Sequence, residues 1–143
     1  MIYFIQGQIT KRIKIGHTNA MIEERMQPMI SSSPDKLKFL GGMSGDTKLE
    51  KYLHNKFKEF FSHGEWYNDN DSIITYINNN CIKNIEYLEI INAEVLNGKL
   101  SFEEALKMSE DEIIAISREH ISYAYKNLFK KVKLPDFNDD ITL

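Results

Sequence analysis

Two polar side chains near the N-terminus, Tyr3 and Lys14, have types and spacing that suit one shared chemical task. Residues 2–6 and 11–16 read as the two arms of a β-hairpin, separated by a glycine-containing break. If the arms pair antiparallel, we expect Tyr3 and Lys14 to lie close together on one face. A phenol becomes a credible base only where nearby cations stabilise the phenolate, and an ammonium can bind phosphate as a point charge.

A second polar pair, Glu50 and His54, lies on a predicted amphipathic helix. The two residues are four positions apart and share one helix face. The carboxylate of Glu50 is a hard oxygen donor of the kind that Mg²⁺ prefers. His54 could orient Glu50 or contact a water on the metal; the alternative is a semi-buried structural histidine. The apolar stripe of the same helix is Leu49, Leu53, Phe57 and Phe60 or Phe61.

The elements around these residues indicate a small α+β domain. Thr18 or Asn19 is expected to cap a helix after the hairpin. Residues 36–42 alternate polar and apolar side chains and predict a third strand. We therefore expect a small three-stranded antiparallel sheet flanked by helices, with residues 65–67 as a candidate edge strand. Pro28 is expected to make the first helix short, or irregular near its C-terminal end. The residues of that helix expected to face the core are Met21, Ile22, Met26, Met29 and Ile30.

The back half of the chain reads as helical throughout. Asn78–Asn80 is the best candidate boundary, which divides the chain into a domain over 1–78, a helical extension over 82–134 and a tail over 135–143. Capping-box patterns begin at Ser101 and at Ser109, and the second is expected to open a helix that runs to about Lys131. The extension is expected to serve in packing, homodimer formation or partner binding.

Composition restricts the class of protein. With 42% hydrophobic and 27% charged residues, the 143-residue chain should be globular, and no apolar run reaches the ~18 residues that span a bilayer. Cys81 is the only cysteine, so we expect no internal disulfide, no cysteine-based zinc site and a reducing, cytoplasmic location. Residues 1–68 carry 10 Lys and Arg against 7 Asp and Glu, whereas residues 69–143 carry 8 against 14. The basic front half could approach a polyanion.

Several short segments occur together in a specific order and spacing. They are Ile2-Tyr3, Lys14-Ile15-Gly16, Arg25, Ser33 to Leu37, Leu49-Glu50 with Leu53-His54, and Gly64 to Tyr67. In these segments the chain resembles the GIY-YIG endonuclease superfamily, over roughly residues 1–77. The resemblance is closest to its phage and bacterial branch of meiotically up-regulated-gene type, whose second motif is Lys-Ile-Gly. The chain departs from the superfamily pattern at Met1, which takes a glycine position, and at Lys14, which replaces the second tyrosine.

The resemblance implies a function and a site. It implies metal-dependent hydrolysis of DNA phosphodiester bonds in a bacterial or infected-host cytoplasm. The implied catalytic residues are Tyr3, Lys14, Arg25 and Glu50, with Glu50 binding a single Mg²⁺ or Mn²⁺ ion. Tyr3 would act as base or proton relay, and Lys14 and Arg25 would hold the phosphate. The candidate supporting residues are Gly16, His17 and His54.

Each of these residues also has an ordinary structural interpretation. Tyr3 can be a packed aromatic residue, Lys14 a solvated strand charge, and Arg25 and Glu50 surface charges on amphipathic helices. Trp66 and Tyr67 more simply attach the last helix to the sheet. The rival function is therefore a catalytically inactive protein of the same fold. Such a protein would bind nucleic acid, a nucleotide or a protein partner, for example as a phage regulator or inhibitor.

Overall fold

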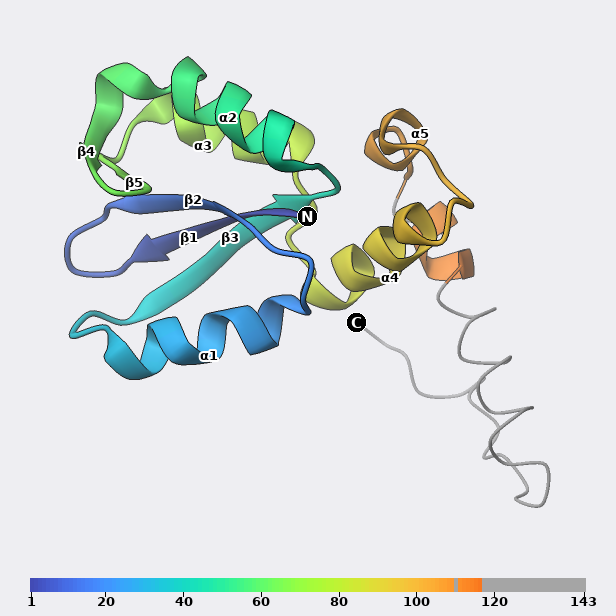
Figure 1. Ribbon diagram of the computed structural model, residues 1–143, viewed down its shortest axis with the longest axis horizontal. Helices are drawn as coiled ribbons and strands as arrows, with labels where there is room; N and C mark the ends of the chain where they lie inside the picture. The colour runs from blue at the N-terminus through green and yellow to red at the C-terminus, as the bar shows by residue number, and fades with distance from the viewer. Residues whose placement is uncertain (110, 117–143) are drawn as a thin grey trace.

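The computed structural model describes residues 1–109 and 111–116 and has the α+β architecture expected from the sequence (Figure 1). An antiparallel sheet lies between helices on its two faces. The elements in chain order are β1 (Ile2–Gly7), β2 (Ile13–His17), α1 (Ile22–Ser32), β3 (Leu37–Met43), α2 (Thr47–Lys56), the 3₁₀ turn η1 (Lys58–Phe60), β4 (Phe61–His63), β5 (Trp66–Tyr67), α3 (Asp71–Asn80), α4 (Ile85–Leu96) and α5 (Phe102–Leu106).

The sheet has five strands in the order β3-β1-β2-β5-β4, so the expectation of three strands is wrong. The predicted hairpin and third strand are present as β1, β2 and β3, and the candidate edge strand at residues 65–67 is realised as β5. The added strands β4 and β5 are 3 and 2 residues long. Strands this short carry too few residues for an alternating pattern, so β5 depends on its pairing with β2, and β4 on its pairing with β5.

The strand register places Tyr3 and Lys14 on one face of the sheet. Tyr3 lies opposite Gly16 and Ile5 lies opposite Lys14 in the antiparallel β1–β2 pair. Since side chains alternate along a strand, Tyr3, Ile5, Lys14 and Gly16 all face the same side. The expected proximity within the hairpin is confirmed at the level of the backbone register.

The two faces of the sheet are covered by different helices. On one face, buried residues of β1 and β2 such as Phe4 and Ile15 form a core with α2 and α3. On the other face, Tyr3 and Ile5 pack against Ile22 and Met26 of α1. Figure 1 shows the same arrangement, with α2 and α3 on one side of the sheet and α1 on the other.

Helix α1 differs from its prediction in its start and its buried face. It begins at Ile22 after Met21, which provides no side-chain cap, whereas Thr18 Oγ1 accepts from the Ala20 N–H outside the helix. Met21 and Ile30 are 52% and 46% exposed, so their assignment to the core is wrong. The face of α1 that packs against the sheet is therefore narrower than the predicted stripe of five apolar residues. It also continues through Pro28 to Ser32.

Helix α2 is shorter than its apolar pattern suggested. It ends at Lys56, and a 3₁₀ turn separates it from Phe61, which lies on β4 and is 51% exposed. Its start is well defined because the Asp46 carboxylate accepts hydrogen bonds from the N–H groups of Lys48 and Leu49, both at 3.0 Å. Leu53 on this helix is fully buried in the sheet core.

The segment after α3 remains in contact with the sheet. Ile82 exchanges two backbone hydrogen bonds with Gly42, and Leu88 of α4 packs in the same cluster as Tyr3. The Ser101–Glu104 capping box is confirmed at the start of α5. The domain boundary near Asn78–Asn80 stays a prediction. The tail over 135–143 and most of the helix predicted to end at about Lys131 lie outside the described residues. Within residues 1–109 and 111–116, no helix has the length and apolar character needed to cross a membrane.

Replacing Leu53 by Ala should lower the free energy of unfolding by about 2–5 kcal/mol, because the cavity would detach α2 from the sheet core. Urea unfolding followed by circular dichroism measures this loss. Lys51→Ala, at an exposed position of the same helix, should change the free energy by less than about 0.5 kcal/mol. Equal losses in both variants would contradict the assigned packing of α2.

Candidate active site

The first contact of the candidate site joins β1 to α1. The Nε–H of Arg25 donates a hydrogen bond to the Tyr3 hydroxyl oxygen at 3.3 Å. This bond to Tyr3, the charge interaction with Tyr3 and the nearby Glu65 raise the pKa of Arg25 against a small opposing effect of burial. Arg25 therefore stays cationic. Among the described residues, Nε is the only Arg25 nitrogen in a side-chain hydrogen bond, so its two terminal nitrogens can reach an anion.

Gly16 provides the space for the Tyr3 ring. A Cβ atom at position 16 would overlap the Tyr3 Cζ and Oη atoms. The Tyr3 ring therefore lies flat against the backbone of the neighbouring strand, and Tyr3 itself is 0% exposed. The glycine of the Lys-Ile-Gly segment acts through this close approach, which is a positioning role rather than a chemical one.

Lys14 is paired with a residue that the sequence reading did not place in the site. Its Nζ lies 2.7 Å from Glu65 Oε2, and the Lys14 side chain is only 14% exposed. Glu65 precedes β5, whose Trp66 lies opposite Lys14 in the register. The ion pair neutralises Lys14 in the absence of a ligand.

Glu50, His54 and Tyr67 form a chain of contacts on the other side of the site. The Tyr67 hydroxyl lies 2.5 Å from His54 Nδ1, and His54 Nε2 lies 3.6 Å from Glu50 Oε1. Burial, followed by the charges of Glu65 and Glu50, raises the pKa of Tyr67. Tyr67 therefore stays protonated, and its hydroxyl can donate to His54 Nδ1 in the tautomer that carries the ring proton on Nε2, the nitrogen that faces Glu50.

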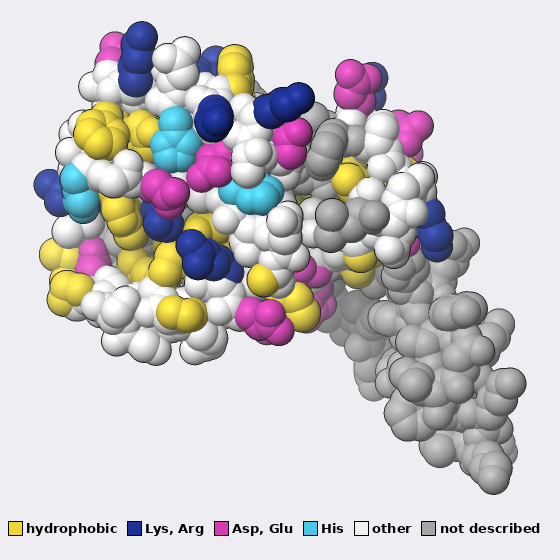
Figure 2. Space-filling view, viewed as in Figure 1, with side chains coloured by type: hydrophobic (Ala, Val, Ile, Leu, Met, Phe, Trp, Pro, Cys, Tyr) yellow, Lys and Arg dark blue, Asp and Glu magenta, His cyan; other side chains and the backbone are white. Residues whose placement is uncertain are grey.

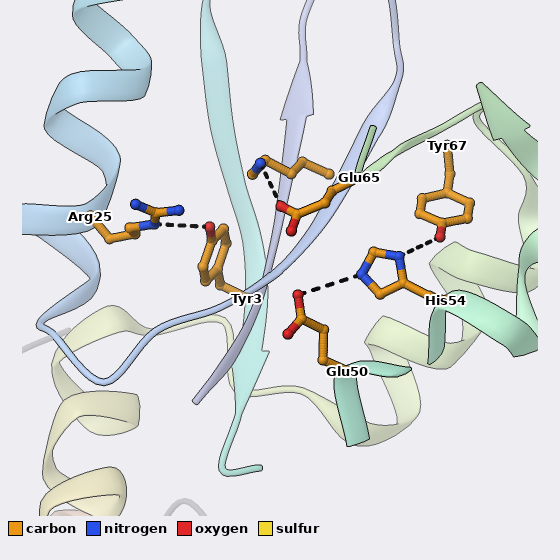
Figure 3. Close-up of polar contacts among 7 residues, drawn as sticks. Tyr3, Arg25, Glu50, His54, Glu65 and Tyr67 are labelled. Atoms are coloured by element: carbon orange, nitrogen blue, oxygen red, sulfur yellow. Dashed lines mark hydrogen bonds and ion pairs between the residues drawn. The ribbon is translucent and has the colours of Figure 1, made fainter. Parts of the chain in front are cut away.

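Side chains from β1, α1, α2 and the segment before β5 meet at this place. Figure 3 shows Tyr3, Arg25, Glu50 and Glu65 directed toward a common space, with His54 between Glu50 and Tyr67. Figure 2 shows charged and histidine side chains gathered in a band between α1 and α2. The assignment of catalytic roles to these residues stays a prediction.

His17 stands apart from this group. It lies opposite Ile2 at the end of β2, on the sheet face opposite to Tyr3, and is half-buried. Among the described residues it makes no hydrogen bond or ion pair with Tyr3, Lys14 or Glu50.

Comparison with known families finds one domain that covers most of this chain. Residues 1–97, from β1 to the end of α4, match the T5orf172 domain. The chain belongs to the T5orf172 domain family. T5orf172 domains are nuclease-associated and GIY-YIG-like, so the match supports the nuclease superfamily but not the narrower Lys-Ile-Gly branch. Searches of curated proteins and of solved structures found no match.

The structure adds two residues of the T5orf172 domain to the candidate site that the sequence did not assign to it. Glu65 belongs to a resembling segment and has no role assigned from the sequence, whereas Tyr67 is expected only to attach the last helix to the sheet. The sequence signal that could have found them is the candidate edge strand at residues 65–67. A strand paired with β2 brings its own residues and those next to it close to Lys14. Tyr67 faces away from Trp66, toward α2, and this orientation is what lets it reach His54.

The contact between Gly16 and Tyr3 predicts a strong energetic coupling. Gly16→Ala should destabilise the protein much more when residue 3 is tyrosine than in a Tyr3→Leu background, because the shorter side chain leaves room for the new methyl group. Urea unfolding of the two single variants, the double variant and the wild type gives the coupling energy. Additive losses would show that the ring does not lie on Gly16.

The cap of α2 predicts a pH dependence of stability. Hydrogen bonds from Leu49 and then Lys48 lower the pKa of Asp46. A carboxyl whose pKa falls on folding stabilises fully above its unfolded pKa of about 3.9, and the effect is lost as pH falls through the folded pKa. The stability difference between wild type and Asp46→Ala should therefore be largest at neutral pH and shrink below about pH 4. Asp69→Ala, in an exposed loop, should show no such trend in urea unfolding at each pH.

Proposed function

We propose that this T5orf172 protein is a metal-dependent endonuclease of the Lys-Ile-Gly branch that hydrolyses DNA phosphodiester bonds. The observation that carries the proposal is the Arg25–Tyr3 hydrogen bond at 3.3 Å. It supports the proposal because the Tyr3 hydroxyl oxygen then lies beside a cationic fork. Glu50 is directed toward the same space, and Lys14 is paired with Glu65 there. Hydrolysis of a phosphodiester needs these parts: a proton acceptor, cations for the developing charge, and a carboxylate for a metal.

Tyr3 serves as the base or as a proton relay: its oxygen takes a proton from the attacking water, and as a relay it passes its own hydroxyl proton on to solvent. The hydrogen bond from Arg25 orients that oxygen. Gly16 fixes the ring from the other side, so the oxygen has few alternative positions. Precise placement of the acceptor is what makes proton transfer efficient at such a site.

Arg25 and Lys14 stabilise the charge that develops on the phosphate. The terminal nitrogens of Arg25 form a planar fork that suits two phosphate oxygens, whereas Lys14 acts as a point charge. Since Lys14 is already paired with Glu65, the phosphate must compete with that carboxylate. Glu65 thus makes the site selective for ligands with a full anionic charge.

Glu50 is the residue that would hold the divalent ion. Its side chain is 19% exposed, one oxygen faces His54, and the carboxylate is directed into the common space (Figure 3). Within the described part of the chain, no group of three or more His, Cys, Asp or Glu residues could enclose an ion. The donor that this proposal assigns is the Glu50 carboxylate, which suits Mg²⁺ or Mn²⁺ that keeps most of its waters. When bound, the ion supplies Lewis-acid stabilisation of the phosphate.

His54 positions Glu50 rather than touching the substrate. Tyr67 holds the ring through Nδ1, and Nε2 then faces the carboxylate at 3.6 Å, beyond hydrogen-bond length. Glu50 therefore keeps its negative charge available for the metal while its orientation is restricted.

One observation favours the alternative of a catalytically inactive binding protein. Tyr3 is 0% exposed and Lys14 is neutralised, so neither group is open to a ligand in this conformation. An inactive member of the family would keep Tyr3 as a packed aromatic residue and bind its ligand elsewhere. A DNA cleavage assay separates the two functions.

Glu50→Gln should lower cleavage of plasmid and of linear and branched DNA duplexes by at least about 100-fold in Mg²⁺ or Mn²⁺, since loss of one group that stabilises developing charge typically costs 10²–10³. Gel analysis of the products, with EDTA as a second control, measures the effect. Glu59→Gln removes the same charge at an exposed position of η1 and should cleave like wild type. Cleavage that survives both EDTA and Glu50→Gln, or no cleavage of any substrate by wild type, overturns the proposal.

A further inference from the structure

We propose that a second nucleotide-binding position lies beside the candidate active site, in the hollow between the hairpin turn and the β4–β5 edge. Its occupant is the nucleotide next to the scissile phosphate on the same DNA strand. Trp66 contacts its base, and Arg12 contacts its phosphate. The inference rests on the proposed function, because it assigns the path of the substrate away from the site.

The hollow is a distinct feature of the surface. It has a volume of about 240 Å³, and its walls include Arg12, His63 and Trp66 on one side and Pro34 and Asp35 on the other. Arg12 and His63 are exposed and Trp66 is half-buried. A hollow of this kind offers an aromatic surface and a cation to one small planar group.

The strand register places these residues on the same sheet face as Tyr3. Trp66 lies opposite Lys14, and His63 lies opposite Trp66. The apolar cluster beneath α1 draws its strand residues from β1 and β3 alone. Among the described residues, α1 therefore packs on the half of this face formed by β1 and β3, and the half formed by β2, β5 and β4 is available to a ligand.

The hollow neighbours the candidate active site, because Lys14 lies next to Trp66 in its wall. The Lys14 Nζ lies 5.9 Å from the centroid of the Trp66 ring. Arg12 lies two positions before Lys14 along the chain, which corresponds to about 7 Å on one face of an extended strand. Two cations in line with an aromatic ring are the arrangement that follows a nucleic-acid strand and stacks its bases.

The Asp35 carboxylate in the hollow already accepts hydrogen bonds from the protein itself. Asp35 accepts hydrogen bonds from the Ile9 and Thr10 N–H groups and from the Thr10 hydroxyl. These bonds tie the hairpin turn to the segment after α1, so Asp35 shapes the hollow rather than pairing with Arg12. Among the described residues, Arg12 has no side-chain ion pair, which leaves its charge for a phosphate.

Trp66 provides a direct readout, because it is the only tryptophan in the chain. The full-length Glu50→Gln variant in EDTA is titrated with a DNA oligonucleotide carrying a 5′ fluorophore. Tryptophan emission reports the hollow, and anisotropy of the fluorophore reports binding anywhere on the protein. Quenching of Trp66 should saturate at the same concentration as the anisotropy. An oligonucleotide of abasic residues should bind with less quenching.

Two variants test the assigned contacts. Arg12→Ala should weaken binding about 5- to 10-fold and reduce the slope of log K against log salt by about one, because one phosphate contact is lost. Lys58→Ala, which removes an exposed cation from η1, should leave both values unchanged. Trp66→Phe should retain binding by anisotropy, whereas Trp66→Ala should weaken it; thermal unfolding of each variant verifies the fold.

The outcomes separate this inference from the proposed function. The second position is overturned if anisotropy reports binding while Trp66 emission stays unchanged and Arg12→Ala binds DNA as tightly as Lys58→Ala. This holds even if wild type cleaves DNA. If DNA quenches Trp66 emission and Arg12→Ala weakens binding, but wild type cleaves no DNA, the second position is supported and the nuclease activity is overturned. Absence of binding in both readouts overturns the inference.

Discussion

The approach of the Tyr3 ring to the backbone at Gly16 is the constraint on which the rest of the site depends. It requires β1 and β2 to pair in one register, because a shift of one residue would turn Tyr3 to the other face. With the ring fixed, α1 can pack beside it and bring Arg25 to its hydroxyl. The same contact therefore serves the hydrophobic core and the polar site.

The two layers of helices contribute opposite halves of the chemistry. Helix α1 supplies a cation over the face that holds Tyr3, and α2 supplies a carboxylate from the other side of the sheet. Neither helix carries a complete site, so the arrangement exists only while both helices are docked on the sheet. Leu53 and Met26, which are buried core residues, thus control the distance between the charges as well as the stability.

Local patterns predicted the long elements, whereas the four candidate site residues came from the resemblance to the GIY-YIG superfamily. Neither predicted the contacts between those residues. The hairpin follows from alternation in residues 2–16, and the cap of α5 follows from Ser101. The β4 and β5 strands could not be predicted with confidence because 3 and 2 residues show no period. Glu65 and Tyr67 were missed as site members for the same reason. Their roles come from pairing with β2, a tertiary fact.

The Lys14–Glu65 ion pair gives the site an internal competitor for its own ligand. Glu65 is held next to Lys14 by β5, which pairs with β2 through only two residues at the margin of the sheet. Any anion that binds Lys14 must therefore exchange with this carboxylate. Its apparent affinity is the intrinsic affinity multiplied by the fraction of molecules in which the carboxylate has moved away. The ion pair thus keeps the charge of a half-buried lysine balanced, so an anion that binds weakly gains little by replacing Glu65.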